Sequence, residues 1–406
     1  MSATAGVPAG ASAPPGAGGI TPARLIMAVF FFHAVLLGNW VPRIPDVAGA
    51  LGLDHRELAV ALLGMPVGTF VAIVLSGRLV ERLTPRLTIL YLFPAYCLLL
   101  ATPGFAGGAV TLFTALMAMG LVFSFIDMAM NVEAARIQDL AGREIMSTVH
   151  GFWSVGNMVG ALMGGQIAEL GVGPGYHHHA VGLVSIPFAV LIAWGLPAIP
   201  PRPAETGARP PVLALPTMAL LGLCVFGTAA VLIEALARNW GGVFLRDVLA
   251  ASPVAIGNAV AGFSLAMAAG RFLGNGAINR FGAVRVARVA GVLATAGLLV
   301  IVVAPSVTIA TVGFVALGLG GSVGFPLAVT AAARRTDRPA ATNVAALALF
   351  GNVAAMLGVT AVGFVAEGFG LRIGLVIALP VIVASALRAG QLRRTGAPDA
   401  PVRATS

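Results

Sequence analysis

The sequence predicts an all-α polytopic membrane protein with twelve transmembrane helices. Hydrophobic residues make up 58% of the 406 residues, and charged residues only 10%. Apolar runs of about 20 residues, the length that crosses a bilayer as a helix, recur along the chain. The net charge of +9 is spread over the short connections between these runs. We therefore expect a lipid bilayer around the protein and no nucleic-acid partner.

The apolar runs give the expected order of elements. Residues 1–22 are mostly Ala, Gly, Pro and Ser without a charge, which predicts a disordered tail and not a signal peptide. A second tail is expected at 391–406, and an even number of spans places both tails on the same side. The spans are expected at 24–46, 57–80, 87–104, 108–133, 148–170, 180–199, 213–237, 252–276, 286–304, 308–333, 340–366 and 369–389.

The basic residues indicate which side that is. All 24 are arginine, and eighteen of them fall in the tails, the central connection and the connections after even-numbered spans. Five lie on the opposite side, and Arg271 lies inside a span. Because positively charged connections stay in the cytoplasm, both termini are expected to be cytoplasmic.

The two halves of the chain resemble each other. A Pro-rich connection, 200–212, separates residues 23–199 from residues 213–390. Landmarks of the first half recur in the second at an offset of 198 residues, for example Arg82 and Arg280. We therefore expect two pseudo-symmetric six-helix bundles joined by a cytoplasmic linker. This is the architecture of alternating-access carriers, which hold their solute between the halves.

Polar side chains interrupt two adjacent spans in the first half. Asp127 and Asn131 are four residues apart and share one helix face, as do His150, Trp153 and Asn157 in the next span. An isolated carboxylate in hydrocarbon is costly, so Asp127 should face protein or water. We expect Asp127 to carry a proton and the other four side chains to contact a solute. The alternative is a structural carboxylate held by Asn131 or His150.

The ionisable groups inside the spans break the internal repeat. At the offset of 198, Asp127 corresponds to Phe325. Because the scaffold tolerates Phe there, the carboxylate is expected to have a task, and burial favours the neutral form that moves a proton. Glu234 is the second candidate for proton coupling. Arg238 follows it by four residues, so a structural ion pair is an equal alternative.

An Asn-Trp pair stands near the outer end of the first span of each half, at Asn39-Trp40 and at Asn239-Trp240. The Asn amides need hydrogen-bond partners in an apolar setting, which makes these positions candidates for solute binding. For Trp40 and Trp240 the alternative is anchoring at the membrane interface, where Trp is enriched.

The connection after the second span carries a family signature. Gly77-Arg-Leu-Val-Glu81-Arg82-Leu-Thr-Pro-Arg86 resembles the loop motif GxxxDRxGRR of the major facilitator superfamily, with Glu81 in place of Asp. A more degenerate copy containing Arg280 follows the eighth span. The resemblance implies a cytoplasmic latch between helices, with Gly77, Glu81, Arg82 and Arg280 as gating residues. The alternative is that these arginines only mark topology.

A narrower resemblance is carried by three segments. These are Asn39-Trp40-Val-Pro-Arg43-Ile-Pro-Asp46, Asp127-Met-Ala-Met-Asn131 and Met146-Ser-Thr-Val-His150-Gly-Phe-Trp153-Ser-Val-Gly156, and together with Asn239-Trp240 they are similar to a bacterial branch of the superfamily related to fucose permeases. The resemblance covers residues 24–389. It implies the fold of the superfamily, a bacterial inner-membrane location, proton coupling and a sugar-like solute.

These observations together predict a secondary active transporter that imports a small polar solute with protons, by alternating access and as a monomer. The runner-up is an exporter of metabolites or drugs by proton antiport. A third interpretation, a membrane sensor that does not transport, would need a larger cytoplasmic segment than the short tails offer. The sequence has no nucleophile-base motif, P-loop or metal-ligand spacing, so we expect no enzymatic activity, cofactor or metal site.

Several further features lead to local expectations. The run His177–His179 is expected in a solvated outer loop, and Arg43 is expected to pair with Asp46 at the outer mouth. Glycines at four-residue spacing from Gly156 to Gly164 should allow close helix packing. Arg271 needs a partner or water, which the sequence does not identify.

Overall fold

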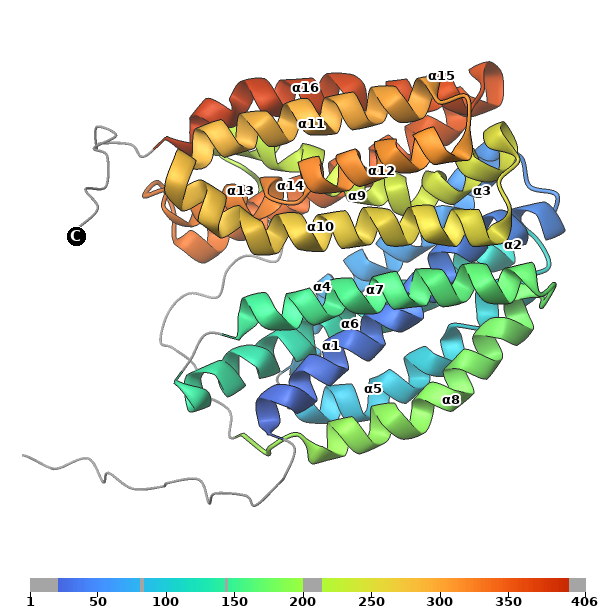
Figure 1. Ribbon diagram of the computed structural model, residues 1–406. Coiled ribbons are helices and arrows are strands. Elements are labelled where there is room, and N and C mark those ends of the chain that lie inside the picture. Colours follow the sequence, from blue (N-terminus) through green and yellow to red (C-terminus); the bar gives the residue numbers. More distant parts are fainter. Residues whose placement is uncertain (1–20, 81–83, 143–144, 200–213, 394–406) are drawn as a thin grey trace, which may run out of the picture.

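A computed structural model describes residues 21–80, 84–142, 145–199 and 214–393. All regular secondary structure in these ranges is helical. Figure 1 shows two groups of helices side by side, α1 to α8 in one and α9 to α16 in the other. The two described chain ends lie at the same end of the molecule, which we call the terminal end; the other is the distal end. The expected linker and most of both tails lie outside the described residues.

The helices of both bundles follow the order of the apolar runs. The first bundle contains α1 (Pro22–Trp40), η1 (Val41–Arg43), α2 (Ile44–Ala50), α3 (His55–Leu62), α4 (Gly64–Val80), α5 (Pro85–Leu99), η2 (Thr102–Phe105), α6 (Ala109–Ala141), α7 (Met146–Glu169) and α8 (Pro174–Gly195). The second contains α9 (Met218–Leu249), α10 (Pro253–Phe281), α11 (Ala283–Val303), α12 (Val307–Gly321), α13 (Gly324–Ala333), α14 (Ala340–Phe369), α15 (Leu371–Val376), α16 (Leu379–Arg388) and η3 (Ala389–Leu392).

Eleven helical segments of the described chain are long and apolar enough to cross a membrane. The remaining long helix, α7, carries more polar side chains. It packs between α1 of its own bundle and α10 of the other, so protein covers much of its surface (Figure 1). The predicted fold class, a polytopic helical membrane protein built from two bundles, is confirmed.

Three of the expected spans are each made of two helices. The breaks fall between α3 and α4, between α12 and α13, and between α15 and α16. In each case a proline, Pro66, Pro326 or Pro380, stands in the first turn of the second helix. Proline lacks the N–H that would continue the preceding helix, and it is tolerated in a first turn because those N–H groups have no intrahelical partner.

The glycines of α7 lie against the backbone of α1. A Cβ atom on Gly156 would collide with the carbonyl oxygen of Phe31, and one on Gly160 with that of Val35. The expected close packing is therefore confirmed. Small residues let two backbones approach in a bilayer, where van der Waals contact drives helix association. This crossing determines where the other face of α7 lies relative to the second bundle.

We predict that Gly160→Val lowers the free energy of unfolding by about 1–3 kcal/mol or more, because the new methyl groups must push α7 away from α1. Thermal unfolding of the purified protein in detergent measures this. Gly276→Val on α10 is the matched control, since no atom lies within 4 Å of a Cβ at that position. Equal losses for the two variants would contradict the role of the crossing.

Candidate functional site

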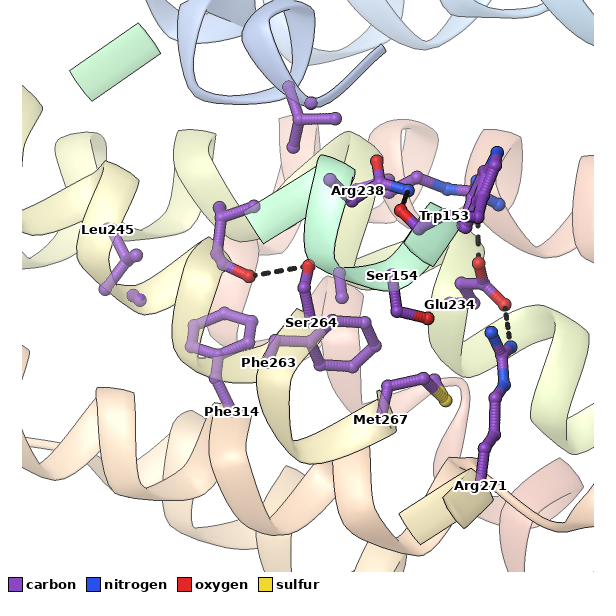
Figure 2. Close-up of a pocket in the computed structure, with 16 residues that line it drawn as sticks. Trp153, Ser154, Glu234, Arg238, Leu245, Phe263, Ser264, Met267, Arg271 and Phe314 are labelled. Carbon is purple, nitrogen blue, oxygen red and sulfur yellow. Dashed lines mark hydrogen bonds and ion pairs between the residues drawn. The ribbon is translucent and has the colours of Figure 1, made fainter. Parts of the chain in front are cut away.

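A pocket lies between the two bundles, halfway along α9 and α10 (Figure 2). Its walls come from α1, η1 and α7 of the first bundle and from α9, α10 and α12 of the second. The space between its atoms, including its opening, is about 590 Å³. Because both bundles supply walls, any movement of one bundle against the other changes the pocket.

Glu234 on α9 lies between two arginines of the pocket wall. Its Oε1 is 3.6 Å from Nη1 of Arg238, one turn further along α9, and its Oε2 is 3.4 Å from Nη2 of Arg271 on α10. Figure 2 shows the Arg271 side chain reaching towards Glu234 from the neighbouring helix. The expected pair with Arg238 is confirmed, and Arg271 has its partner. Two guanidinium groups share one carboxylate, so this part of the pocket is formally positive.

The rest of the wall combines polar groups with aromatic rings. Ser154, Asn157 and Ser264 each donate a hydrogen bond to a carbonyl oxygen one turn earlier in their own helix. Their side-chain oxygens therefore remain available as acceptors. The buried indole N–H of Trp153 has no hydrogen-bond partner within the described chain. The large apolar side chains of the wall are those of Trp153, Phe263, Met267 and Phe314.

His55, at the start of α3, connects the first bundle to two carboxylates of the second. Its Nε2 is 3.5 Å from Asp247 and its Nδ1 is 3.5 Å from Glu367. The backbone N–H of His55 also donates to Glu367 at 3.0 Å. These three residues lie at the distal ends of their helices, so the contacts join the bundles there.

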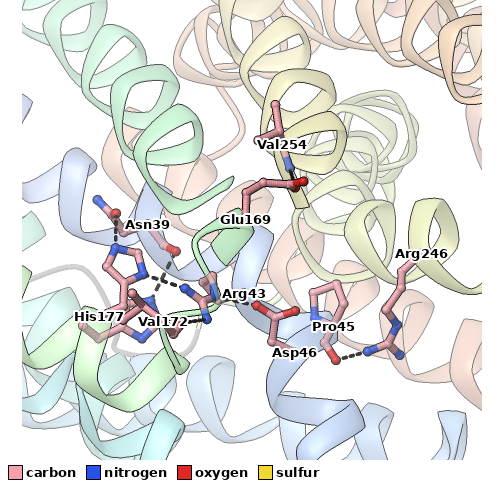
Figure 3. A network of polar contacts seen from close by, with 10 residues as sticks. Asn39, Arg43, Pro45, Asp46, Glu169, Val172, His177, Arg246 and Val254 are labelled. Carbon is pink, nitrogen blue, oxygen red and sulfur yellow. Dashed lines mark hydrogen bonds and ion pairs between the residues drawn. The ribbon is translucent and has the colours of Figure 1, made fainter. Parts of the chain in front are cut away.

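Two more polar contacts join the bundles at the distal end (Figure 3). Arg246 donates to the carbonyl oxygen of Pro45, and the N–H of Val254 donates to Glu169 at 3.3 Å. Along both α9 and α10 the pocket residues lie further from the distal end than these contacts do. The distal contacts therefore lie between the pocket and the distal end of the molecule.

A buried network fixes the distal end of the first bundle (Figure 3). Asn39 Oδ1 is 3.0 Å from Nε2 of His177, and Arg43 Nη1 is 3.1 Å from Nδ1 of the same ring. The amide oxygen accepts and the guanidinium donates, so only the neutral ring with its proton on Nε2 satisfies both. Arg43 also donates to the carbonyl oxygen of Val172 at 2.6 Å. Its ion pair with Asp46, at 2.6 Å, confirms the expected pairing.

The expectation of a solvated loop for the run His177–His179 is wrong. Helix α8 begins at Pro174, and His177 and His178 are 2% and 0% exposed. The reason is the buried Arg43, which needs an acceptor that the His177 ring supplies. No group of three or more His, Cys, Asp or Glu side chains that could hold a metal ion is found among the described residues.

Asp127 and Asn131 lie on α6 and are not part of the pocket wall. The Asn131 amide donates to the backbone oxygen of Asp127 at 2.8 Å, and its distance to Asp127 Oδ1 is 3.5 Å. Within the described chain Asp127 has no ion pair. Trp153, Asn157 and Glu234, by contrast, line the pocket together.

The other candidate solute-binding residues lie outside the pocket wall. Trp40 and Trp240 are 3% and 0% exposed, which contradicts anchoring at the membrane interface. Trp240 donates to the carbonyl oxygen of Val359 at 2.8 Å, and Asn239 donates to its own helix. The exposed ring of His150 has its centroid 5.3 Å from that of Phe30 on α1.

The gating candidates are described only in part. Glu81 and Arg82 lie outside the described residues, and Gly77 belongs to α4. Arg280, near the end of α10, is exposed, and its guanidinium lies over the ring of Phe281 at 5.2 Å.

Sequence reasoning did not identify several residues of the pocket and of the distal contacts. Arg271 was recognisable as a charge inside a span, but its partner lies 37 residues earlier on another helix. Phe263 and Phe314 have no sequence signal, because they resemble every other aromatic residue of the spans. His55 stands just before an apolar run, where a polar residue is ordinary.

Comparison with known proteins places the chain in a family. It is 32% identical to an uncharacterized transporter, y4wD, of Sinorhizobium fredii over 344 residues, which cover 83% of this chain and 89% of the relative. It is 29% identical to an uncharacterized MFS-type transporter of Yersinia pestis over 79% of this chain and 83% of that one. Membrane protein MosC of Rhizobium meliloti is 25% identical over 72% and 70%. No protein-family model matches the chain.

Solved structures share the fold. A point mutant of the nucleoside transporter NupG superposes with a TM-score of 0.73 at 13% identity, over 92% of this chain and 100% of NupG. A bacterial homologue of the human lysosomal transporter Spinster, in an inward-facing and occupied conformation, gives 0.70 at 16% identity, over 92% and 97%. The candidate membrane spans together with the curated relatives identify a multi-pass membrane transporter. The chain belongs to the major facilitator superfamily.

We predict that Asn39→Ala lowers the free energy of unfolding by about 1–3 kcal/mol, because it leaves the buried Nε2–H of His177 without an acceptor. Asn239→Ala, at the equivalent place in the second half, is the control, since the only hydrogen bond described for its amide is to Ala235. Thermal unfolding in detergent without added solute measures both. A loss for Asn239→Ala equal to that for Asn39→Ala would contradict the structural role of the network.

Proposed function

We propose that the protein is a secondary active transporter that imports a small polar solute together with protons by alternating access. The pocket between the bundles carries this proposal. Solute held there contacts both halves at once, so rocking of residues 24–199 against 213–389 exposes it first to one side and then to the other.

The composition of the pocket supports a hydroxylated, sugar-like solute. The oxygens of Ser154, Asn157 and Ser264 can accept hydrogen bonds from hydroxyl groups. The Trp153 ring offers a flat apolar face and a free N–H. NupG, a protein of the same fold, is named a nucleoside transporter, and nucleosides also combine a sugar with a flat ring.

Proton coupling is assigned to Asp127 and Glu234. Asp127 is a carboxylate within a span, and it has no ion pair in the described chain. Such a group is costly to keep in a membrane, so its presence points to a function. Glu234 stands in the pocket itself, where a solute can alter its pairing with arginine. Proton binding neutralises these two carboxylates, so the carrier would reorient with fewer unpaired charges inside the membrane.

The distribution of arginine indicates how the protein is oriented in the membrane. The terminal end carries most of the basic residues, so we assign it to the cytoplasm of a bacterium and place the protein in the inner membrane. The distal contacts then close the outer side. Gly77 and Arg280 stand near the terminal ends of α4 and α10, and we propose that they form the cytoplasmic latch with Glu81 and Arg82, which lie outside the described residues. A single chain contains the complete pocket, which supports a monomeric transporter.

We predict that Asp127→Asn keeps solute exchange but abolishes accumulation driven by a pH gradient, since the amide cannot take up a proton. A thermal-shift screen first identifies a sugar or polyol that binds, because a ligand that binds the folded state raises its stability. Exchange and pH-driven accumulation of that compound are then measured in proteoliposomes. Asp127→Glu keeps the carboxyl group and should retain coupling. Normal pH-driven accumulation by Asp127→Asn would remove this residue from the mechanism.

A further inference from the structure

The arginines of the pocket have more hydrogen-bonding capacity than Glu234 uses. Each guanidinium carries five N–H donors in a planar fork. Between the two side chains and Glu234 the described contacts are one at 3.4 Å and one at 3.6 Å, longer than the ~2.8 Å of a strong charge-assisted hydrogen bond. Arg238 and Arg271 are also 35% and 30% exposed, so a second anion can reach them.

The positive charge is confined to one end of the pocket. Glu234, Arg238 and Arg271 come from α9 and α10 of the second bundle. Across from them, α7 supplies Trp153, Ser154 and Asn157, which are uncharged. A solute that fits both sides therefore has one anionic group and one uncharged polar part.

Resting on the transport function proposed above, we propose that the solute is a sugar acid, a hydroxylated compound with a single carboxylate. Its carboxylate pairs with Arg271 and Arg238, the geometry for which a guanidinium fork is suited. Its hydroxyl groups meet the oxygens of Ser154 and Asn157 and the free indole N–H of Trp153.

The number of charges favours one carboxylate over none or two. Glu234 is one carboxylate for two arginines, so one guanidinium group is in excess and can pair with one carboxylate of the solute. A neutral sugar would leave the guanidinium donors that Glu234 does not use without an anionic partner, and the second carboxylate of a dicarboxylate would face the uncharged residues of α7 without a cationic partner. Both are costly where water is scarce.

The same arrangement couples the anion to a proton. A solute carboxylate competes with Glu234 for Arg271 and repels it, so Glu234 takes up a proton as the anion binds. The loaded pocket then carries two arginines, one anion and a neutral Glu234, which is the same net charge as the empty pocket. Because of this balance, reorientation of the loaded and of the empty pocket meets the same electrical barrier from these four groups.

Binding is tested on the full-length protein in detergent with D-glucuronate, D-glucose and D-glucarate as monoanionic, neutral and dianionic probes. Glucuronate should bind at least about tenfold more tightly than the other two, measured by thermal shift and titration calorimetry. Arg271→Gln should reduce the glucuronate affinity about tenfold or more, whereas Arg288→Gln, an exposed arginine outside the pocket, should not. Equal binding of glucose and glucuronate, or equal losses in the two variants, overturns the inference.

Coupling is tested with Glu234→Gln. Glucuronate binding to the unmodified protein should tighten as the pH falls, by up to about tenfold per pH unit for one proton. In Glu234→Gln the binding should persist and lose this pH dependence. Retained pH dependence would overturn the coupling role of Glu234.

Flux in proteoliposomes separates this inference from the transport proposal. Accumulation of glucose, but not of glucuronate, under an inward proton gradient would uphold import with protons and overturn the sugar-acid assignment. Glucuronate binding that depends on Arg271, without accumulation of any probe, would uphold the assignment of the pocket and overturn proton-driven import.

Discussion

A charged side chain in the interior of either bundle has little water available, and burying it without a partner is costly. Arg43 shows the consequence. The Arg43 guanidinium contacts Asp46, His177 and a carbonyl oxygen of the α7–α8 turn, so one buried arginine connects η1 to α8. Glu234 does the same for α9 and α10 through Arg271. An ion pair or hydrogen bond that compensates a buried charge therefore also holds two helices in a defined position relative to each other.

The two bundles contribute differently to the pocket although they share a fold. The second bundle supplies the three charged groups, and the first supplies an indole ring, a hydroxyl and an amide from α7. Helix α7 can reach the second bundle because its glycines let it lie close to α1 on one side while it packs against α10 on the other. An asymmetric solute with one charged end fits this unequal distribution better than a uniform one.

The distal contacts join the two bundles at one end of the molecule. His55 contacts Asp247 and Glu367, and Arg246 contacts a backbone oxygen of the α2 segment, so the bundles are joined by groups at their helix ends. These contacts are partly exposed and individually modest, which suits an interface that opens in the proposed transport cycle. The buried network around His177, by contrast, lies within one bundle and has no need to open.

The sequence by itself determined the fold class, the order of the helices and the charges inside the spans, because hydropathy, Pro and the four-residue Gly spacing are local properties of the chain. It also identified the pair of Glu234 with Arg238 and that of Arg43 with Asp46, since both lie within one helical turn. Only the tertiary structure decided that Arg271 meets Glu234, that His177 is buried against Arg43, and that Asp127 lies outside the pocket wall. Such contacts depend on how helices cross and rotate, which follows from packing across the whole bundle and not from any one segment.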